Sequence, residues 1–396
     1  MMIFPAALFN TLVLTLIGNL WIPNIIGQEG FSQWRQVLTV LAYAGLAHIG
    51  FADGLQSLWV ENKGRPKLSF IMIIIPITLL SLLIYWIYTF LVGKNQINIA
   101  FLFILTTLNP FFVNYIVSHS KSIILVKFYT IQILFYGIFV YLGVHIFHFS
   151  GLNIPVFGQI FLICLGIICA FWVYSKDQRK VEQVLTARDI FIKYRGASLY
   201  FLNLTLITIF SFDRITALYL LSKEDQSQYF FLSLPVTLAS TTSLLFSGII
   251  FSRNIFFSKG VIILARVFSI SAIIAVLLIP DIWLKDIIHF LYRKFDTGNL
   301  TIFLCSSVVV FYFSVFLLPE IRRYFVRPFI LSSFALAIIF FVFSFFLVSD
   351  YLTLATSYFI YLTILVIFME LLINSRPMKL FTKNLTKGDQ LDENTD

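Results

Sequence analysis

Long apolar stretches follow one another along almost the whole chain, separated by short polar segments. Most are about 17 to 25 residues long, which is the length an α-helix needs to cross the hydrocarbon core of a bilayer. The pattern therefore predicts an all-α integral membrane protein with about twelve transmembrane helices. Their approximate ranges are 3–26, 36–60, 68–92, 97–118, 123–147, 154–175, 198–221, 229–251, 260–280, 299–319, 328–349 and 352–373.

Two polar segments divide this pattern into domains. Residues 1–175 predict an N-terminal six-helix bundle, and residues 198–373 predict a C-terminal six-helix bundle. Residues 176–197 place apolar positions among charges, which predicts a cytoplasmic linker with an amphipathic helix on the membrane surface. Residues 374–396 are polar and predict a disordered cytoplasmic tail.

The composition supports the membrane class. Hydrophobic residues make up 59% of the 396 residues and charged residues only 12%, whereas a soluble domain carries roughly 45–50% apolar and about 25% charged residues. A soluble globular protein and a disordered one are therefore excluded. The three cysteines, Cys164, Cys169 and Cys305, lie inside apolar stretches and show neither a disulfide framework nor metal-ligand spacing.

The distribution of basic residues predicts the topology. The chain carries a net charge of +9 and 28 Lys and Arg residues. If both termini are cytoplasmic, 20 of these residues fall in inner segments and six in outer ones, while Arg214 and Arg266 lie within spans. Such an excess of inner positive charge is typical of membrane topology. The basic balance is thus explained by the membrane, without nucleic acid as a partner.

An internal repeat is indicated by two similar outer loops. The first reads IIGQEGFSQW, from Ile25 to Trp34, and the second reads LLSKEDQSQY, from Leu220 to Tyr229. They lie 195 residues apart, so that Glu29 and three further polar or aromatic positions correspond. Six spans in each half would bring both halves into the membrane from the same side, which predicts parallel repeats related by an axis along the membrane normal.

The same two regions carry a family resemblance. The run GFSQWRQVLTVLAYAGLAHIGFADGLQ, Gly30 to Gln56, resembles the span 1–2 region of bacterial polysaccharide and O-antigen flippases. These belong to the multidrug/oligosaccharidyl-lipid/polysaccharide exporter superfamily. The run SFDRITALYLLSKEDQSQYFFLSLPVT, Ser211 to Thr237, resembles the span 7–8 region, where Asp-Arg precedes an outer loop and a Tyr opens span 8. Where the family often has Asp in span 2, this chain has His48, with Asp53 further on.

The resemblance implies a transporter and not an enzyme. Two six-helix bundles would enclose a central cavity and move undecaprenyl-diphosphate-linked oligosaccharide, by alternating access, from the inner to the outer leaflet of the bacterial cytoplasmic (inner) membrane. The cargo would be an O-antigen or related repeat unit for lipopolysaccharide or another polysaccharide. No cofactor is implied, and coupling to protons or sodium ions stays open. A polysaccharide polymerase and chain-length complex are the candidate protein partners.

Charged residues inside a membrane are costly, so each one is a functional hypothesis. Asp213 and Arg214 lie in span 7, where they would contact the anionic head group or couple an ion, or else lock helices together. Adjacent helical residues point in different directions, so the two need not pair with each other. In span 2, Asp53 is a third candidate, and His48 is either a satisfied core residue or a proton-coupling group.

Four further polar positions complete the candidate set. Arg35, at the start of span 2, is an interfacial anchor or a ligand for the released diphosphate. Asn203 suits sugar hydroxyls and equally suits hydrogen bonds between helices. We expect Arg266 to be structural, either pairing with Asp53 or reaching the cytoplasmic face, and we expect Glu370 to meet solvent or a basic loop.

Two other functions stay open. An O-antigen polymerase or another polytopic membrane enzyme would be similarly long, but the longest outer segment, 281–298, is short and partly apolar. We also do not expect any of the five histidines to form the acid–histidine pair at helical spacing that acyl transfer would use. A multidrug exporter of the same fold would need an apolar, aromatic-lined cavity, which the 46 phenylalanines allow.

Overall fold

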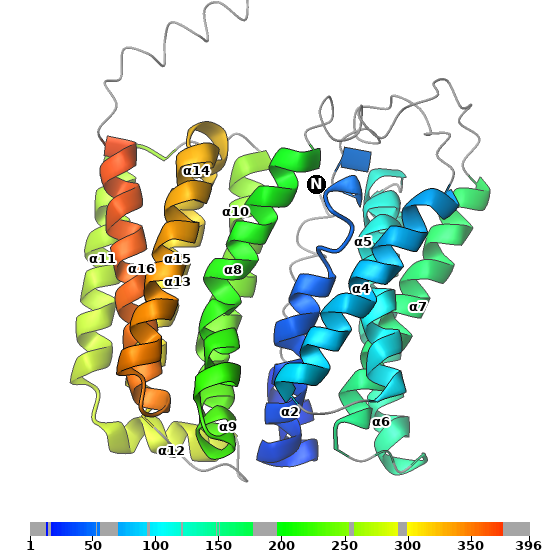
Figure 1. The fold of residues 1–396 in the computed structure, drawn as a ribbon, viewed down its shortest axis with the longest axis horizontal. Helices are drawn as coiled ribbons and strands as arrows, with labels where there is room; N and C mark the ends of the chain where they lie inside the picture. Colours follow the sequence, from blue (N-terminus) through cyan, green and yellow to red (C-terminus); the bar gives the residue numbers. More distant parts are fainter. Residues whose placement is uncertain are drawn as a thin grey trace, which may run out of the picture.

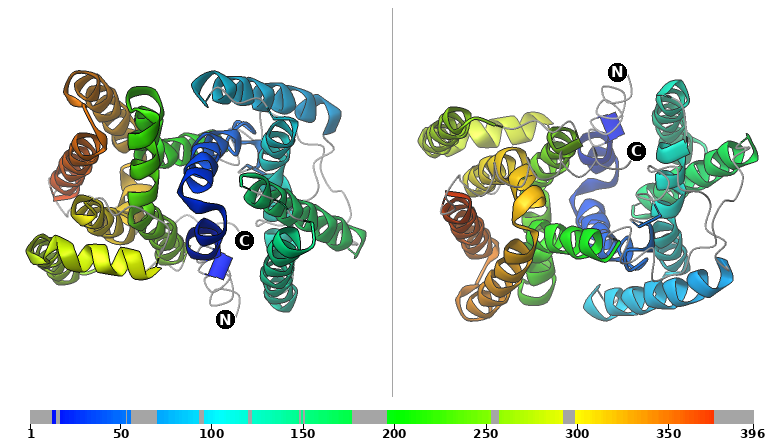
Figure 2. Two further views of the ribbon diagram at one scale, coloured as in Figure 1. Left: turned by 90° about the horizontal axis from the view of Figure 1, so that it is seen from below. Right: turned by 90° about the horizontal axis from the view of Figure 1, so that it is seen from above.

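The protein is helical throughout the part of the chain that its computed structural model describes, with no strand in those residues. The described residues are 13–14, 17–52, 54–55, 70–92, 96–119, 122–147, 149, 151–176, 196–252, 257–291 and 299–374. The helices form two groups that stand side by side (Figure 1). The two groups meet where α2 packs against α8 and α9 (Figure 2).

The bounds of the helices follow the chain in order. The N-terminal group contains η1 (Ile17–Trp21), α2 (Ile22–Ala44), α4 (Phe70–Val92), α5 (Ile97–His119), α6 (Ser122–His145) and α7 (Asn153–Lys176). The C-terminal group contains α8 (Gly196–Leu220), α9 (Lys223–Leu232), α10 (Leu234–Ser252), α11 (Lys259–Leu278), α12 (Asp281–Leu291), α13 (Thr301–Tyr312), η3 (Phe313–Leu317), α14 (Leu318–Tyr324), α15 (Val326–Leu347) and α16 (Tyr351–Asn374).

The predicted membrane class is confirmed in its coarse form. Within the described ranges, six helical segments are long and apolar enough to cross a membrane, and further apolar helices are shorter. The six are Asn153–Val173, Gly196–Leu220, Gly260–Leu278, Thr301–Arg322, Val326–Leu347 and Tyr351–Asn374. The chain is thus a multi-pass helical membrane protein. The count of twelve spans and the cytoplasmic placement of both termini stay predictions.

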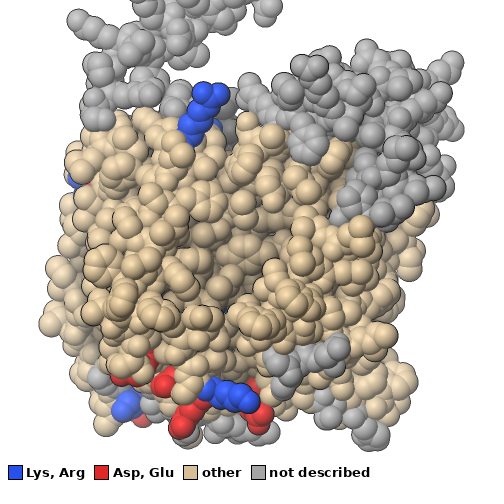
Figure 3. Space-filling model, viewed as in Figure 1, with Lys and Arg blue, Asp and Glu red and all other residues tan. Residues whose placement is uncertain are grey.

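The outer surface of the bundle suits contact with lipid. Large apolar side chains stand exposed on its helices, among them Phe268 at 73%, Leu278 at 76% and Phe346 at 78%. The visible middle of the molecule shows no charged residue among its described side chains, and most of the charged side chains in view lie at the lower edge (Figure 3). An apolar belt bordered by charge is the arrangement expected where hydrocarbon replaces water as the solvent.

The first two predicted spans have different bounds in the structure. Residues 27–35 were expected to include a loop, but α2 runs from Ile22 to Ala44 and is broken only at Gly27, where φ is +74°. A single glycine makes this break because it adopts positive φ without steric cost. The predicted range 36–60 is also interrupted, since residues 45–50 form turns that include Ile49 and Gly50 at positive φ.

The segment 281–298, expected to connect two spans on the outer side, is helical in its first part. Residues Asp281–Leu291 form the helix α12, which crosses the lower end of the C-terminal group (Figure 1). Ile282 and Phe290 are exposed while Leu284 is buried. A short helix with polar residues among these apolar ones suits a position along the membrane interface, where it is too short to span.

The helix breaks support an internal repeat. Gly27 interrupts the helical path between η1 and the body of α2, and Ser222 interrupts it between α8 and α9. These two positions are 195 residues apart, the spacing of the two similar loops. Ser222 also caps α9 by accepting a hydrogen bond from the Asp225 backbone N–H at 3.2 Å.

The linker prediction for 176–197 and the tail prediction for 374–396 lie almost wholly outside the described residues.

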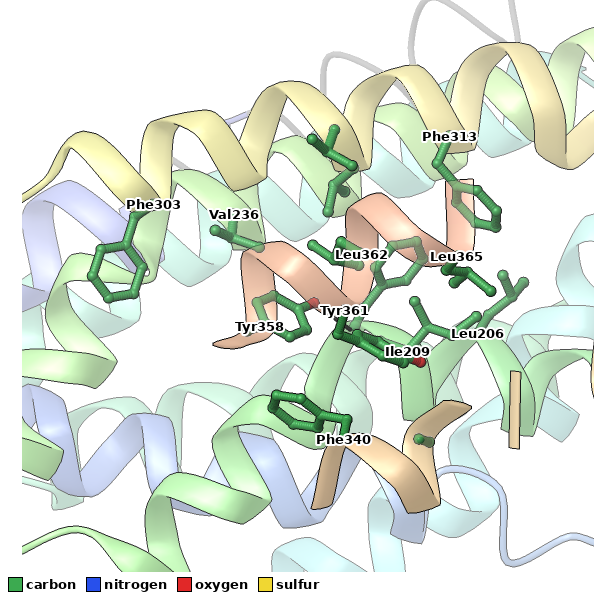
Figure 4. Close-up of a cluster of buried hydrophobic side chains, with 14 of the residues drawn as sticks. Leu206, Ile209, Val236, Phe303, Phe313, Phe340, Tyr358, Tyr361, Leu362 and Leu365 are labelled. Atoms are coloured by element: carbon green, nitrogen blue, oxygen red, sulfur yellow. Dashed lines mark hydrogen bonds between the residues drawn. The ribbon is translucent and has the colours of Figure 1, made fainter. Parts of the chain in front are cut away.

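The core of the C-terminal group gathers around α8 and α16. Ile209 and Leu206 of α8 face Tyr358, Leu362 and Leu365 of α16, with α13 and α15 closing the cluster (Figure 4). Each of these side chains is at most 5% exposed. Because α8 is held firmly by this packing, the polar groups that it carries are held in fixed positions as well.

Replacing Gly50 with alanine should lower the thermal unfolding midpoint of the detergent-purified protein. Gly50 has φ of +82°, and an added Cβ would lie 2.6 Å from the Gly196 carbonyl oxygen at the start of α8. The strain and the clash should cost about 2 kcal/mol or more. Gly137→Ala is the matched control, because nothing lies within 4 Å of its added Cβ. An unchanged midpoint for Gly50→Ala would contradict this packing.

Candidate functional site

The candidate site is built on α8, which carries two charged residues deep in the bundle. Asp213 is 1% exposed and Arg214 is 7% exposed. Arg214 precedes the Leu220 end of α8 by six residues, which is about 9 Å at roughly 1.5 Å per residue. Both groups therefore lie below the end of the bundle that carries α9, in surroundings where an unpaired charge would be costly.

The two neighbours make separate contacts. Asp213 accepts a hydrogen bond at its Oδ2 from the Tyr229 hydroxyl of α9 at 2.6 Å. Arg214 donates from Nη2 to the Thr237 hydroxyl of α10 at 2.9 Å. This agrees with the expectation that adjacent residues of a helix need not pair with each other, because they point about 100° apart. The charge of Arg214 still acts on the Asp213 carboxylate at close range.

Arg35 of α2 reaches the same place from the N-terminal group. Its guanidinium donates to Thr237 Oγ1, the hydroxyl that also accepts from Arg214. Arg35 is only 5% exposed, and its guanidinium carbon lies 6.0 Å from the centre of the Phe31 ring. The structure thus places Arg35 between the two groups of helices, where it is buried, whereas an interfacial anchor would be exposed.

These five residues are called the charge cluster below: Arg35, Asp213, Arg214, Tyr229 and Thr237. With its ionisable side chains charged, the cluster has two guanidinium groups for one carboxylate and an excess of positive charge. Two buried polar atoms, Asp213 Oδ1 and Arg214 Nε, have no hydrogen-bond partner among the described residues. Since buried polar groups are nearly always satisfied, the cluster has capacity for a further polar ligand.

Two further tyrosines, Tyr358 and Tyr43, lie near the charge cluster. Tyr358 of α16 donates a hydrogen bond to the Ile209 carbonyl of α8 at 2.9 Å. It also interacts electrostatically with Asp213 and Arg214. Tyr43 of α2 interacts with the Thr208 side chain of α8. The Tyr43 hydroxyl therefore adds a polar contact between α2 and α8, and the Tyr358 hydroxyl adds one between α16 and α8.

The charged members of the cluster were predicted from the sequence, whereas Thr237 and the nearby Tyr43 were not. Charged residues inside an apolar stretch are conspicuous, whereas threonine and tyrosine are ordinary there. Tyr229 stood in the segment with the family resemblance but was not expected to bind Asp213. Nothing along the sequence joins Arg35 to Thr237, which is 202 residues away.

The other candidates lie elsewhere. His48 is 3% exposed and accepts a hydrogen bond at Nδ1 from the Gly50 backbone N–H at 3.1 Å. The rings of Phe111 and Tyr200 meet it edge-on. These contacts fit a core histidine at the break after α2. Asn203 is half-buried and precedes Asp213 by ten residues on α8, about 15 Å along the axis. Asp53 lies outside the described residues.

Arg266 and Glu370 form a separate ion pair. Arg266 Nε lies 3.0 Å from Glu370 Oε1, Arg266 Nη2 lies 3.0 Å from Glu370 Oε2, and the Tyr312 hydroxyl also donates to Glu370. The expectation that Glu370 meets solvent or a basic loop was wrong, because α11 brings Arg266 to α16. The structural interpretation of Arg266 fits this bidentate pair, and the two intramembrane arginines do not share a site.

One cavity of about 340 Å³ lies along the seam between α2, α4 and α8. Its lining is Val40, Tyr43, Leu46, Ala47, Leu80, Ile84, Ile87, Leu91, Tyr200, Leu204 and Ile215. We expected a polar central cavity, whereas this one is almost wholly apolar. Within the described ranges, no group of His, Cys, Asp and Glu is arranged to hold a metal ion.

The chain matches no protein-family model and no curated protein. The fold and the site define its class on their own. It is a polytopic α-helical membrane protein in which helices from the N-terminal and C-terminal groups meet at a buried, predominantly cationic cluster.

Tyr229→Phe should lower the unfolding midpoint, because it removes the hydrogen bond to Asp213 and leaves that carboxylate buried with fewer partners. The expected loss is about 1–3 kcal/mol. Tyr361→Phe is the matched control, since the Tyr361 hydroxyl is buried without a hydrogen-bond partner among the described residues. Thermal denaturation of both purified variants checks this, and equal midpoints would contradict the role of Tyr229.

Proposed function

We propose that this protein is a flippase that moves undecaprenyl-diphosphate-linked oligosaccharide from the inner to the outer leaflet of the bacterial cytoplasmic membrane. The observation that carries the proposal is the charge cluster, in which Arg35 and Arg214 converge on one hydroxyl inside an apolar bundle. The family resemblance around Gly30 to Gln56 and Ser211 to Thr237 supports the same function.

The chemistry of the cluster suits an anionic head group. A guanidinium binds phosphate oxygens through paired, charge-assisted hydrogen bonds, which are about twice as strong as neutral ones. Thr237 is a neutral acceptor that two arginines share. A diphosphate would offer both arginines a stronger acceptor than this hydroxyl, so it would replace Thr237 as their partner.

That exchange provides a step for alternating access. Arg35 belongs to the N-terminal group, whereas Arg214 and Thr237 belong to the C-terminal group, so the hydrogen bond from Arg35 to Thr237 connects the two groups. Gln36 also donates to Gln226 of α9 at 3.2 Å. A ligand shifts a conformational equilibrium only through contacts that differ between the two states. Release of Thr237 on head-group binding is such a difference.

A second candidate is a multidrug exporter of the same fold. The apolar cavity with Tyr43 and Tyr200 in its lining favours this function, because pockets for apolar drugs are lined by hydrophobic and aromatic side chains. The two functions differ in what the arginines do. A flippase for a diphosphate needs the cationic excess of the charge cluster, whereas an exporter of apolar cations would be hindered by it.

Arg214→Ala should lower export of lipid-linked repeat units about tenfold or more, because a hydrogen bond to a charged group contributes about 1.5–3 kcal/mol. Arg266→Ala should lower it less, since Arg266 binds Glu370 away from the cluster. The measurement is surface polysaccharide and intracellular lipid-linked repeat units in a strain lacking the chain and complemented with each variant at matched expression.

Two outcomes of this complementation would contradict the proposal. Equal export by Arg214→Ala and the parent protein would remove the cluster from the transport path. Surface chains of a single repeat unit in the deletion strain would indicate a polymerase, because export would then have continued without elongation.

Linking α2 to α9 should stop transport. The test protein carries Gln36→Cys and Gln226→Cys, which place two thiols where the amides now form a hydrogen bond. The native cysteines, Cys164, Cys169 and Cys305, are replaced by alanine. A short bifunctional thiol reagent should abolish export, and reduction of a cleavable reagent should restore it. The single Gln226→Cys variant controls for modification alone. Full export by the cross-linked protein would exclude movement between α2 and α9.

A further inference from the structure

The apolar cavity along the seam has the form of a long slot. Its lining residues on α8 run from Tyr200 to Ile215, and those on α4 run from Leu80 to Leu91. These stretches cover about 22 Å and about 16 Å along their helix axes at roughly 1.5 Å per residue. A cavity of about 340 Å³ drawn out over such a length is elongated, a shape that suits an extended hydrocarbon chain.

The slot is continuous with the surface that faces lipid. Ile87 lines the slot and is 42% exposed, while Leu83 and Trp86 on the same helix are 51% and 64% exposed. The α4 side of the slot therefore opens toward the surrounding hydrocarbon. Its remaining lining is formed by aliphatic side chains and two tyrosines, which give a flexible apolar chain many contacts and few polar groups to desolvate.

One part of the slot adjoins the charge cluster. Ile215 lines the slot and directly follows Arg214 on α8. Tyr43 also lines the slot, and the charges of Asp213 and Arg214 act on it. An apolar slot with a cationic group beside it is complementary to a lipid that has a single chain and an anionic head.

We infer that the slot holds part of one isoprenyl chain while the phosphate attached to that chain lies at the charge cluster. This inference rests on the proposed function for the identity of the cargo, and it adds where the anchor of that cargo is held. The competing occupant is a diacyl phospholipid, which brings two chains to one head group. The sugar would extend beyond the phosphate and makes no contact with the slot.

Undecaprenyl phosphate, which carries no sugar, is the probe for this inference. Its binding to the full-length purified protein is measured by native mass spectrometry in parent and variant proteins. Ile215→Phe and Ala47→Phe both add a ring inside the slot, and each should weaken binding about tenfold or more. Leu83→Phe adds the same ring on the lipid-facing side of α4 and should leave binding unchanged. Two slot variants are used so that the result survives if one of them fails to fold.

A second comparison locates the head group. Arg214→Ala should weaken binding of undecaprenyl phosphate and leave binding of uncharged undecaprenol unchanged. Phosphatidylglycerol with two palmitoyl chains should bind more weakly than undecaprenyl phosphate to the parent protein, and it should be insensitive to Ile215→Phe.

The results separate the inference from the proposed function. Equal binding of undecaprenyl phosphate by Ile215→Phe, Leu83→Phe and the parent would overturn the inference, even if export depends on the protein. Equal sensitivity of both lipids to the slot variants would also overturn it, because the slot would then accept acyl chains in general. Selective loss in the slot variants supports the inference, even if a strain lacking the chain exports its polysaccharide normally.

Discussion

Arg35 and Arg214 both donate hydrogen bonds to the Thr237 hydroxyl, and the proposed function of this protein depends on this interaction. Two guanidinium groups, one from each group of helices, are held in an apolar interior, where each charge needs partners. Asp213 and Tyr229 supply the balancing anion and its hydrogen-bond donor. The cluster thus joins the two groups of helices through contacts that an anionic ligand would replace.

The rest of the fold holds this contact in place. Packing of α8 against α16 through Ile209 and Tyr358 holds the helix that presents Asp213 and Arg214. The ion pair of Arg266 with Glu370 connects α11 to α16 on a separate part of the C-terminal group. Since that pair is satisfied within one group and the cluster bridges both, the cluster would change when the groups move relative to each other, whereas the pair would not.

The sequence predicted the coarse architecture because lipid imposes a simple rule. A span needs a long apolar stretch, so composition and spacing were enough for α8, α11, α15 and α16. Composition and spacing were not enough to predict where a helix breaks or where a short helix forms. Gly27 breaks a helix without a polar loop, and α12 is a helix because its apolar residues favour the membrane interface, although it is too short to be read as a span. The charged members of the site were visible, but Thr237 and the pairing of Glu370 with Arg266, 104 residues away, arise only from tertiary packing.

The most direct test of the central claim is transport by the purified protein reconstituted into liposomes. Undecaprenyl-diphosphate-linked oligosaccharide is placed in both leaflets, and a glycosidase that cannot cross the membrane is added outside. If the protein is a flippase, the enzyme will consume the substrate of both leaflets when the parent protein is present, and it will consume that of the inner leaflet about tenfold more slowly, or not at all, when liposomes carry Arg214→Ala. Consumption limited to the outer leaflet with the parent protein would contradict the account.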